Sequence, residues 1–512
     1  GARGVFRTAW QPASVARTPN DAAPCARASA RLCAAMPRRA PAALPTMLAV
    51  VDMGSNSFRL EVGRVEGDQI YRLDTVRETL RMGAGIDEKG NLTPQAQRDA
   101  LACLARFGER LRGFPPANVR AVATNTFRVA RNSGKFLRRA HEVLGFPIDV
   151  IAGHEEARLI YIGVAHVLPP GDAPRLVVDI GGGSTEFIVG RGMAPERLES
   201  LKIGCVTMSA RFFPDGTLSK DAFEAAETHA QVEVEAIARE FSRRHWKEAY
   251  ASSGTALALA DILEQNGLSV AGITPDGLAK LRRRMIDAGH VKRLKLAGLK
   301  AERAPVLGGG FAVMAAAIRE LDVPRINPVG GALRLGVLYD LLGRREHRDS
   351  REATVAAFVE RYHIDRPHGE RVAALARELY RKAAPRPDPD AERHVVWSAL
   401  LHEVGYPVSH IGFHKHGAYI LGNADMPGFS RQEQQWMALL VLGCRGGLDK
   451  VEGALADASL RAQLLALRLA VLFHHARQPI DTPRIGIRTG RSFGVEESAR
   501  WLRAHPLSAH LL

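Results

Sequence analysis

One unit of sequence occurs twice in the chain, with an offset of 127 residues. In the first copy the apolar residues 48–51 lead into residues 52–57, Asp-Met-Gly-Ser-Asn-Ser, and a second apolar run follows. In the second copy residues 175–178 lead into residues 179–186, Asp-Ile-Gly-Gly-Gly-Ser-Thr-Glu. Seven of fourteen aligned positions are identical, including the Asp, Gly and Ser of an Asp-x-Gly-x-x-Ser pattern. Apolar runs on both sides of a Gly-rich turn predict a strand–turn–strand unit that has been used twice.

The residues of this turn suit phosphate and a divalent cation. Glycines let the backbone approach a ligand and direct several N–H groups at one point. Asp52 and Asp179, at the strand ends, are placed to hold a hydrated cation such as Mg²⁺, which prefers oxygen ligands. Further donors are the hydroxyls of Ser55, Ser57, Ser184 and Thr185. Two such turns facing each other predict a cleft for a phosphate chain, and duplicated halves are the plan of the actin, sugar-kinase and Hsp70-type (ribonuclease H-like) fold.

A series of segments, taken in chain order, resembles the signatures of the exopolyphosphatase and guanosine-pentaphosphate phosphatase family. The segments are residues 52–58, 123–128, 153–161, 179–186, 252–255 and 331–334. The resemblance runs from about residue 48 to about residue 475 and is nearest to the long bacterial exopolyphosphatases. It implies an α/β fold with a duplicated actin-like core, an all-α HD-like C-terminal domain, Mg²⁺ as the cofactor and a homodimer.

Within that resemblance the catalytic base falls on Glu156, the second glutamate of a pair. A carboxylate in a closed cleft can accept a proton from the attacking water. The alternative is that the pair only opens a helix, where acids favour the positive end of the dipole, and we assign that part to Glu155. Arg128 is expected to clamp phosphate, because a guanidinium offers a bidentate fork and stays charged.

The resemblance also implies the ligands of the metal and the phosphates. Asp179 and Glu186 are expected to hold the metal, together with Asp52. The residues expected to bind phosphate are Ser55, Asn56, Ser57, Gly181, Gly182, Ser184, Ser253, Gly254 and Thr255.

We expect five parts along the chain. Residues 47–170 and 171–342 are the predicted actin-like domains, 343–455 a helical HD-like domain beginning in a charged linker, and 456–512 a small C-terminal domain. Residues 1–46 contain seven Arg and one acid and show no periodicity, so we expect them to be disordered. The simpler explanation is that these residues are translated sequence upstream of a true start at Met47. The alternative is a transit-like peptide, which is also Arg-rich and poor in acids.

The helical half resembles the HD-type phosphohydrolase domain, which binds metals through a His, a His-Asp pair and a later Asp. His368 can stand as the first histidine, but the pair is His402-Glu403 and Val471 stands where the last Asp would lie. Because valine cannot ligate a metal, we expect this domain to be catalytically silent. A remaining basic cluster is the predicted track for a long polyphosphate, unless its histidines are merely structural. The track consists of His414, Lys415, His416 and Arg468.

The charge of the chain favours an anionic ligand. The formal net charge is +15, of which residues 1–46 contribute +6. The leading hypothesis is an exopolyphosphatase that removes the terminal phosphate of inorganic polyphosphate, processively. The alternative is a guanosine pentaphosphate 5′-phosphohydrolase, since the reacting group is a terminal phosphoryl in both; the basic second domain favours the polymer. A non-hydrolytic actin-like phosphate- or nucleotide-binding module is a third possibility.

The expected location is the cytoplasm, without a membrane. No apolar run reaches the roughly 18 to 20 residues of a membrane helix. The five cysteines are scattered and odd in number, which indicates a reducing compartment.

Overall fold

The computed structural model describes residues 46–67, 69–345, 349–477, 486–488 and 494–496. The predicted disordered extension therefore lies, apart from Thr46, outside the described residues. The described part contains two five-stranded sheets with the same topology, and a set of helices follows them in the chain.

Each sheet is built from one copy of the duplicated unit. The first has the order β3-β2-β1-β4-β5, and the second has the order β8-β7-β6-β9-β10. In both, the first three strands are antiparallel and the last two add in parallel. The strands of the first sheet are β1 (Met47–Met53), β2 (Ser57–Glu66), β3 (Gln69–Thr79), β4 (Val119–Ala123) and β5 (Ile148–Val150). Those of the second are β6 (Arg175–Ile180), β7 (Thr185–Arg191), β8 (Ala194–Leu201), β9 (Glu248–Ser252) and β10 (Asn327–Pro328).

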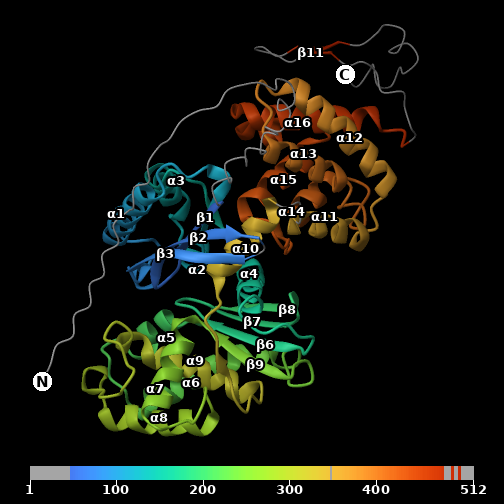
Figure 1. Ribbon diagram of the computed structural model, residues 1–512. Helices are drawn as coiled ribbons and strands as arrows, with labels where there is room; N and C mark the ends of the chain where they lie inside the picture. The colour runs from blue at the N-terminus through green and yellow to red at the C-terminus, as the bar shows by residue number, and fades with distance from the viewer. Residues whose placement is uncertain (1–45, 68, 346–348, 478–485, 489–493, 497–512) are drawn as a thin grey trace, which may run out of the picture. The chain divides into compact units, whose positions relative to one another are not determined.

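The apolar strands are buried on both faces, as their unbroken hydrophobic runs require. In β1, Ala49 and Val51 pack under the outer helices, whereas Leu48 and Val50 pack against α4 (Gly153–Ala165) and α10 (Leu333–Arg345). These two helices lie between the sheets (Figure 1). The same alternation in β6 confirms the predicted duplicated core.

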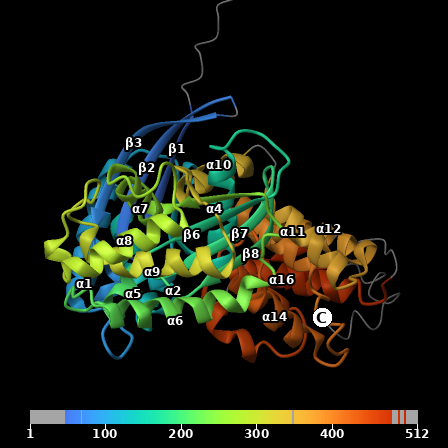
Figure 2. The same ribbon diagram turned by 90° about the horizontal axis from the view of Figure 1, so that it is seen from below.

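The outer faces of the sheets carry separate sets of helices, and α6 and α9 lie side by side over the second sheet (Figure 2). Helices on the first sheet are α1 (Pro94–Arg110), α2 (Asn125–Val129) and α3 (Ser133–Leu144). Helices on the second are α5 (Cys205–Phe212), α6 (Lys220–Ala238), α7 (Ser253–Gln265), α8 (Pro275–Ala288) and α9 (Ala304–Glu320).

Glycines bring α4 and α10 into backbone contact. A Cβ atom on Gly336 would overlap the carbonyl oxygen of Leu159, and one on Gly163 would overlap that of Ala332. Larger residues would push the helices apart, so this contact fixes α4 between the two sheets.

The C-terminal region is helical, as expected, and has two adjoining cores. Its helices are α11 (Ser350–Arg361), α12 (Arg366–Ala383), α13 (Pro389–Leu400), α14 (Phe413–Asn423), α15 (Arg431–Gly443) and α16 (Ala458–Phe473). A short hairpin of β11 (Gly486–Arg488) and β12 (Gly494–Glu496) follows. α16 shares one hydrophobic core with α12 and α13. The predicted domain boundary at residue 456 would divide this core, and it stays a prediction. Among the described helices, none combines the length and apolar character that a membrane crossing needs.

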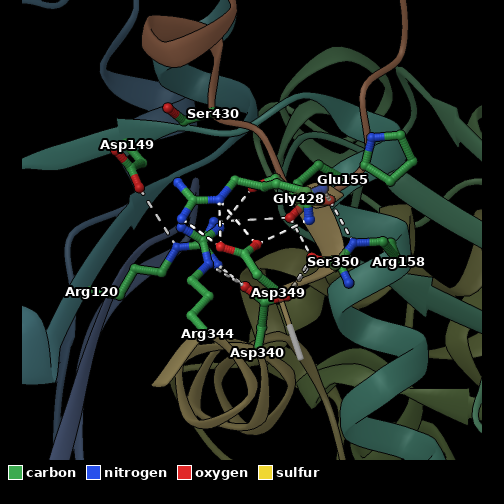
Figure 3. A network of polar contacts seen from close by, with 12 residues as sticks. Arg120, Asp149, Glu155, Arg158, Asp340, Arg344, Asp349, Ser350, Gly428 and Ser430 are labelled. Carbon is green, nitrogen blue, oxygen red and sulfur yellow. Dashed lines mark hydrogen bonds and ion pairs between the residues drawn. The ribbon is translucent and has the colours of Figure 1, made fainter. Parts of the chain in front are cut away.

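A buried network of charges joins the helical region to the core (Figure 3). We call it the junction network; its members are Arg120, Glu155, Arg158, Asp340, Arg344 and Gly428. Asp340, on α10, lies 2.7 Å from Arg120 Nη1, 2.6 Å from Arg158 Nη2 and 3.0 Å from Arg344 Nε. Burial alone would raise the pKa of Asp340, but the three guanidiniums hold it well below its usual range.

Gly428 lies in the loop before α15, and both its N–H and its carbonyl group are hydrogen-bonded. Its N–H donates to Glu155 Oε2 at 2.8 Å, and its carbonyl accepts from Arg344 Nη2 at 2.7 Å. Arg158 donates to both carboxylate oxygens of Glu155, at 2.7 and 2.9 Å. The charged stretch that we interpreted as a linker thus contains Arg344 and Asp349, which lie inside the structure. Charges can be buried there because each has partners of opposite sign.

Candidate active site

The two duplicated turns face each other at the mouth of a cleft. A Cβ atom on Gly182 would lie 3.0 Å from the amide nitrogen of Asn56, and one on Gly183 would lie 3.1 Å from Ser55 Oγ. Glycine is therefore what allows the β6–β7 turn to approach the β1–β2 turn. A cavity of about 300 Å³ opens here, and all nine residues predicted to bind phosphate line it. Asp52, Glu156 and Asp179 line the same cavity.

The third wall of the cleft is the turn from β9 into α7. Ser253, its first helical residue, has a φ of 90°, which is rare for a residue with a side chain. Its Oγ accepts from the amides of Thr255 and Ala256, both at 3.2 Å. Gly254 lies so close to the Arg303 guanidinium that a Cβ would overlap it. A strained serine and an obligatory glycine at one helix N-terminus are typical of a ligand site.

Two buried carboxylates lie beside each other on the β6–β7 side of the cleft: Asp179 lines the cavity, whereas Glu186 is buried next to it and does not line it. Asp179 and Glu186 are direct partners across β6 and β7. Ser252 Oγ donates to Asp179, and Ser200 Oγ donates to Glu186 Oε1 at 2.9 Å. Burial raises the pKa of Asp179 to about 6. Burial also raises the pKa of Glu186 well above its ordinary value, and Glu156 and Asp179 add to the effect.

Several carboxylates crowded together out of water are costly without a cation. Oxygen donors of this kind fit a divalent metal ion. Among the described residues, however, the carboxylate oxygens of Asp52, Asp179 and Glu186 do not all lie within 4.8 Å of one another, so this ligand set stays a prediction.

The residue of the first sheet that aligns with Glu186 in the repeat is Arg59, which carries the opposite charge. There the direct partner of Asp52 is Arg59. Arg59 belongs to a group that lines the cleft, which we call the cation cluster: Arg59, Arg77, Lys300, Arg303 and Arg334. Burial and the neighbouring Arg334 together lower the pKa of Arg59 to about 10, although Asp52 opposes the fall. Within the cluster, Arg77 pairs with Glu302, and Arg334 pairs with Glu61 and Asp52.

We did not predict the cation cluster from the sequence. Its members come from β2, β3, the loop before α9 and α10, and no local pattern joins them. The available signal was Arg59 itself, which aligns with Glu186 in the repeat.

Glu156 and Arg128 meet behind the phosphate turns. Arg128 Nη1 donates to Glu156 Oε2 at 2.7 Å and to the carbonyl of Ile151 at 3.0 Å. Burial raises the pKa of Glu156, and Arg128 opposes that rise. Arg128 lines a neighbouring cavity of about 290 Å³. The predicted phosphate clamp is thus paired with the predicted base, and both roles stay predictions.

Asp52 has a different neighbour from the other carboxylates. Its Oδ2 lies 3.5 Å from Arg334 Nη1. Burial raises the pKa of Asp52 and Arg334 lowers it. Because a guanidinium already lies beside it, we rank Asp52 after Asp179 and Glu186 as a metal ligand.

The hydrogen-bond partners of the Glu155 carboxylate were not expected from the sequence. Its carboxylate is fully engaged by Arg158 and the amide of Gly428 in the junction network. The pair Glu155-Glu156 therefore points one carboxylate to the helical region and the other to the Arg128 side of the cleft.

The residues of the predicted polyphosphate track lie in the helical region. His414, Lys415 and His416 begin α14, and Arg468 on α16 donates to the carbonyl of Gly443 at 3.0 Å. Burial, with the nearby cations, lowers the pKa of His414 to about 4, so this side chain is neutral near neutral pH. The track itself stays a prediction.

The HD-type positions form a compact buried group. Ligand atoms of His368, His402 and Glu403 lie within 4.8 Å of one another. Both carboxylate oxygens of Glu403, however, accept from Arg477, at 2.8 and 2.9 Å. A guanidinium is thus the partner of the third potential ligand, and Val471 packs against the core of the helical region.

The fold and the cleft define an actin-like α/β protein whose two halves enclose a site with an acidic and a basic side. The chain belongs to the Ppx/GppA phosphatase family: a model of that family matches residues 62–345, and a model of its domain III matches residues 350–512. Membership makes the chain a hydrolase of phosphate-containing substrates, of a family that generally depends on divalent metals.

Relatives and a solved structure agree with this. Guanosine-5′-triphosphate,3′-diphosphate pyrophosphatases of Vibrio parahaemolyticus and Vibrio vulnificus are each 35% identical over 469 residues, covering 90% of this chain and 94% of theirs. A crystal structure of an exopolyphosphatase from Cytophaga hutchinsonii is 25% identical, with a TM-score of 0.53, and covers 58% of this chain and 98% of that chain. The predicted family and fold are confirmed, but the curated relatives' names favour our alternative function over the leading one.

Proposed function

We propose that the protein hydrolyses the terminal phosphoanhydride bond of guanosine pentaphosphate and releases orthophosphate. The observation that carries this proposal is that Glu156, the two phosphate turns and a dense cation cluster share one cleft. The choice of a nucleotide over the polymer rests on the relatives named for that substrate.

In this proposal each side chain has a part. Glu156, held by Arg128, accepts a proton from the water that attacks the terminal phosphorus. A carboxylate with a raised pKa is a better proton acceptor than an ordinary one. As the anhydride P–O bond breaks, the released phosphate takes the water oxygen, and the bridging oxygen stays on the shortened chain.

The charge of the phosphates is balanced from two sides. Asp179 and Glu186, with Asp52, would hold Mg²⁺, which when bound neutralises charge on the phosphoryl oxygens. The cation cluster and the amides of the glycine turns bind the remaining phosphates.

Inorganic polyphosphate is the second candidate substrate. The solved exopolyphosphatase with the same core and the basic cluster on α14 favour it. In either case we propose a homodimer that acts in the cytoplasm, as the family resemblance implies.

Orthophosphate release by the purified protein with Mg²⁺ tests the proposal. Guanosine pentaphosphate and long-chain polyphosphate are compared at matched terminal-phosphate concentration, with Glu156→Gln and the exposed Glu360→Gln as test and control. We expect faster release from the nucleotide and a loss of about 10²–10⁴-fold in kcat for Glu156→Gln alone. Faster release from the polymer would establish the second candidate, and no release from either would reject both.

A further inference from the structure

The cleft continues past the phosphate turns along one face of α7. Gly254 lines it at the start of the helix, Leu257 and Ala258 line it one turn later, and Asp261 lines it after another turn. With a rise of about 1.5 Å per residue, Asp261 lies about 10 Å beyond Gly254 along the helix axis. The site is therefore longer than a terminal phosphate requires.

The far end of the cleft is unlike the rest of it. Leu257 is a large apolar side chain that stays 41% exposed there. Asp261 is exposed, and among the described residues its carboxylate has no ion-pair or hydrogen-bond partner. The other acid on this side, Glu302, lies 3.6 Å from Arg77 and is compensated. A free carboxylate beside an apolar surface repels a polyanion and offers nothing to a phosphate.

The position of this end relative to the cation cluster is set by the fold. Asn266, after the end of α7, exchanges hydrogen bonds with the backbone of Ala297 at 2.9 and 3.3 Å. Gly298, with a φ of 80°, packs against the backbone of Asp261. The loop of residues 297–303, which carries Lys300 and Arg303, is thus fixed to α7 at Asp261 and Asn266.

Asp261 and Leu257 together suit a purine base that presents two adjacent hydrogen-bond donors. The Watson–Crick edge of guanine presents N1–H and an exocyclic amino group side by side, and one carboxylate can accept both. Adenine presents an acceptor at N1, which a carboxylate repels. The exposed side chain of Leu257 provides an apolar surface for the face of the base. Of the cation cluster, Arg303 lies against Gly254 at the start of α7, and Lys300 is in the same loop.

We propose that Asp261 and Leu257 form the guanine-recognition end of the cleft, and that Asp261 determines the preference for a guanine nucleotide over inorganic polyphosphate. This inference rests on the proposed function, because it places the phosphates of that substrate on the cation cluster.

The test compares three substrates with Asp261→Ala, Asp261→Asn and Leu257→Ala: guanosine pentaphosphate, its adenosine counterpart and long-chain polyphosphate. We expect Asp261→Ala to raise the KM for guanosine pentaphosphate on the order of ten- to a hundredfold, with kcat little changed, because a charged pair of hydrogen bonds is lost. The KM for polyphosphate should stay constant or fall, and discrimination against the adenosine nucleotide should shrink. Asp287→Asn, an exposed acid on α8 outside the cleft, is the matched control and should change nothing.

Equal effects of Asp261→Ala on the nucleotide and the polymer, or no effect on the nucleotide, would overturn the inference while leaving the proposed function intact. Equilibrium binding of guanosine pentaphosphate to the full chain tests guanine recognition independently of the proposed hydrolysis. If the wild type releases no phosphate from guanosine pentaphosphate but binds it in an Asp261-dependent way, the inference stands and the proposed reaction fails.

Discussion

Gly428 is one of the residues that attach the helical region to the catalytic core. Its φ of 88° lies in the region that favours glycine. A Cβ there would lie 2.6 Å from Ser350 Oγ and 3.1 Å from the amide nitrogen of Arg351. Ser350 cannot move away freely, because its Oγ donates to Asp340 Oδ1 at 3.2 Å. Gly428→Ala therefore strains the backbone and crowds the junction network at once.

The magnitude follows from these two effects. The left-handed conformation costs a residue with a Cβ about 1–2 kcal/mol, and overpacking a filled site adds about 1–3 kcal/mol. We expect Gly428→Ala to lower the free energy of unfolding by about 2–5 kcal/mol. Gly113 has nearly the same φ, 89°, and no atom within 4 Å of its Cβ position, so Gly113→Ala should cost only the backbone part.

Urea unfolding followed by circular dichroism measures both variants against the wild type. Orthophosphate release measured in parallel should fall for Gly428→Ala alone, because the amide of Gly428 is bonded to Glu155, the neighbour of the proposed base. Equal shifts of the two unfolding midpoints would show that the contacts of Gly428 contribute nothing and would refute this reasoning.

Two further predictions concern the pH dependence of stability and the binding of substrate. His154 Nδ1 lies 2.6 Å from Asp425 Oδ2, a contact that raises the pKa of His154 above 6.5. The stabilisation should be complete below that value and lost as pH rises through the raised pKa, so the difference in thermal midpoint between wild type and His154→Gln should shrink toward alkaline pH; a constant difference would contradict it. Arg303→Ala should raise the KM for the phosphorylated substrate about tenfold with little change in kcat, as steady-state kinetics would show, whereas the exposed Arg319→Ala should leave KM unaltered.

The duplicated turns could be predicted from the sequence because their information is local. Asp179 and Gly182 stand in one short motif, so their positions in the cleft follow once the strands are recognised. Lys300 and Arg77 could not be predicted, because segments far apart in the chain bring them together.

The charge pattern of the sequence led to a wrong interpretation where the charged side chains are buried. Arg344 and Asp349 belong to a stretch that is typical of a solvated linker in sequence, yet Arg344 pairs with Asp340 and Asp349 pairs with Arg351 inside the structure. Sequence shows which residues carry charge, but the partners that make burial tolerable become visible only in three dimensions.

The divergence between Arg59 and Glu186 gives the cleft a direction. Two identical repeats would make its two sides alike, and a phosphate chain could then enter with either end first. Arg59 lines the cleft on the first repeat, whereas the aligned Glu186 is buried beside Asp179 on the second, so the two repeats present different chemistry to the cleft. Divergence at this aligned position makes a cleft built from two copies of one unit asymmetric in charge.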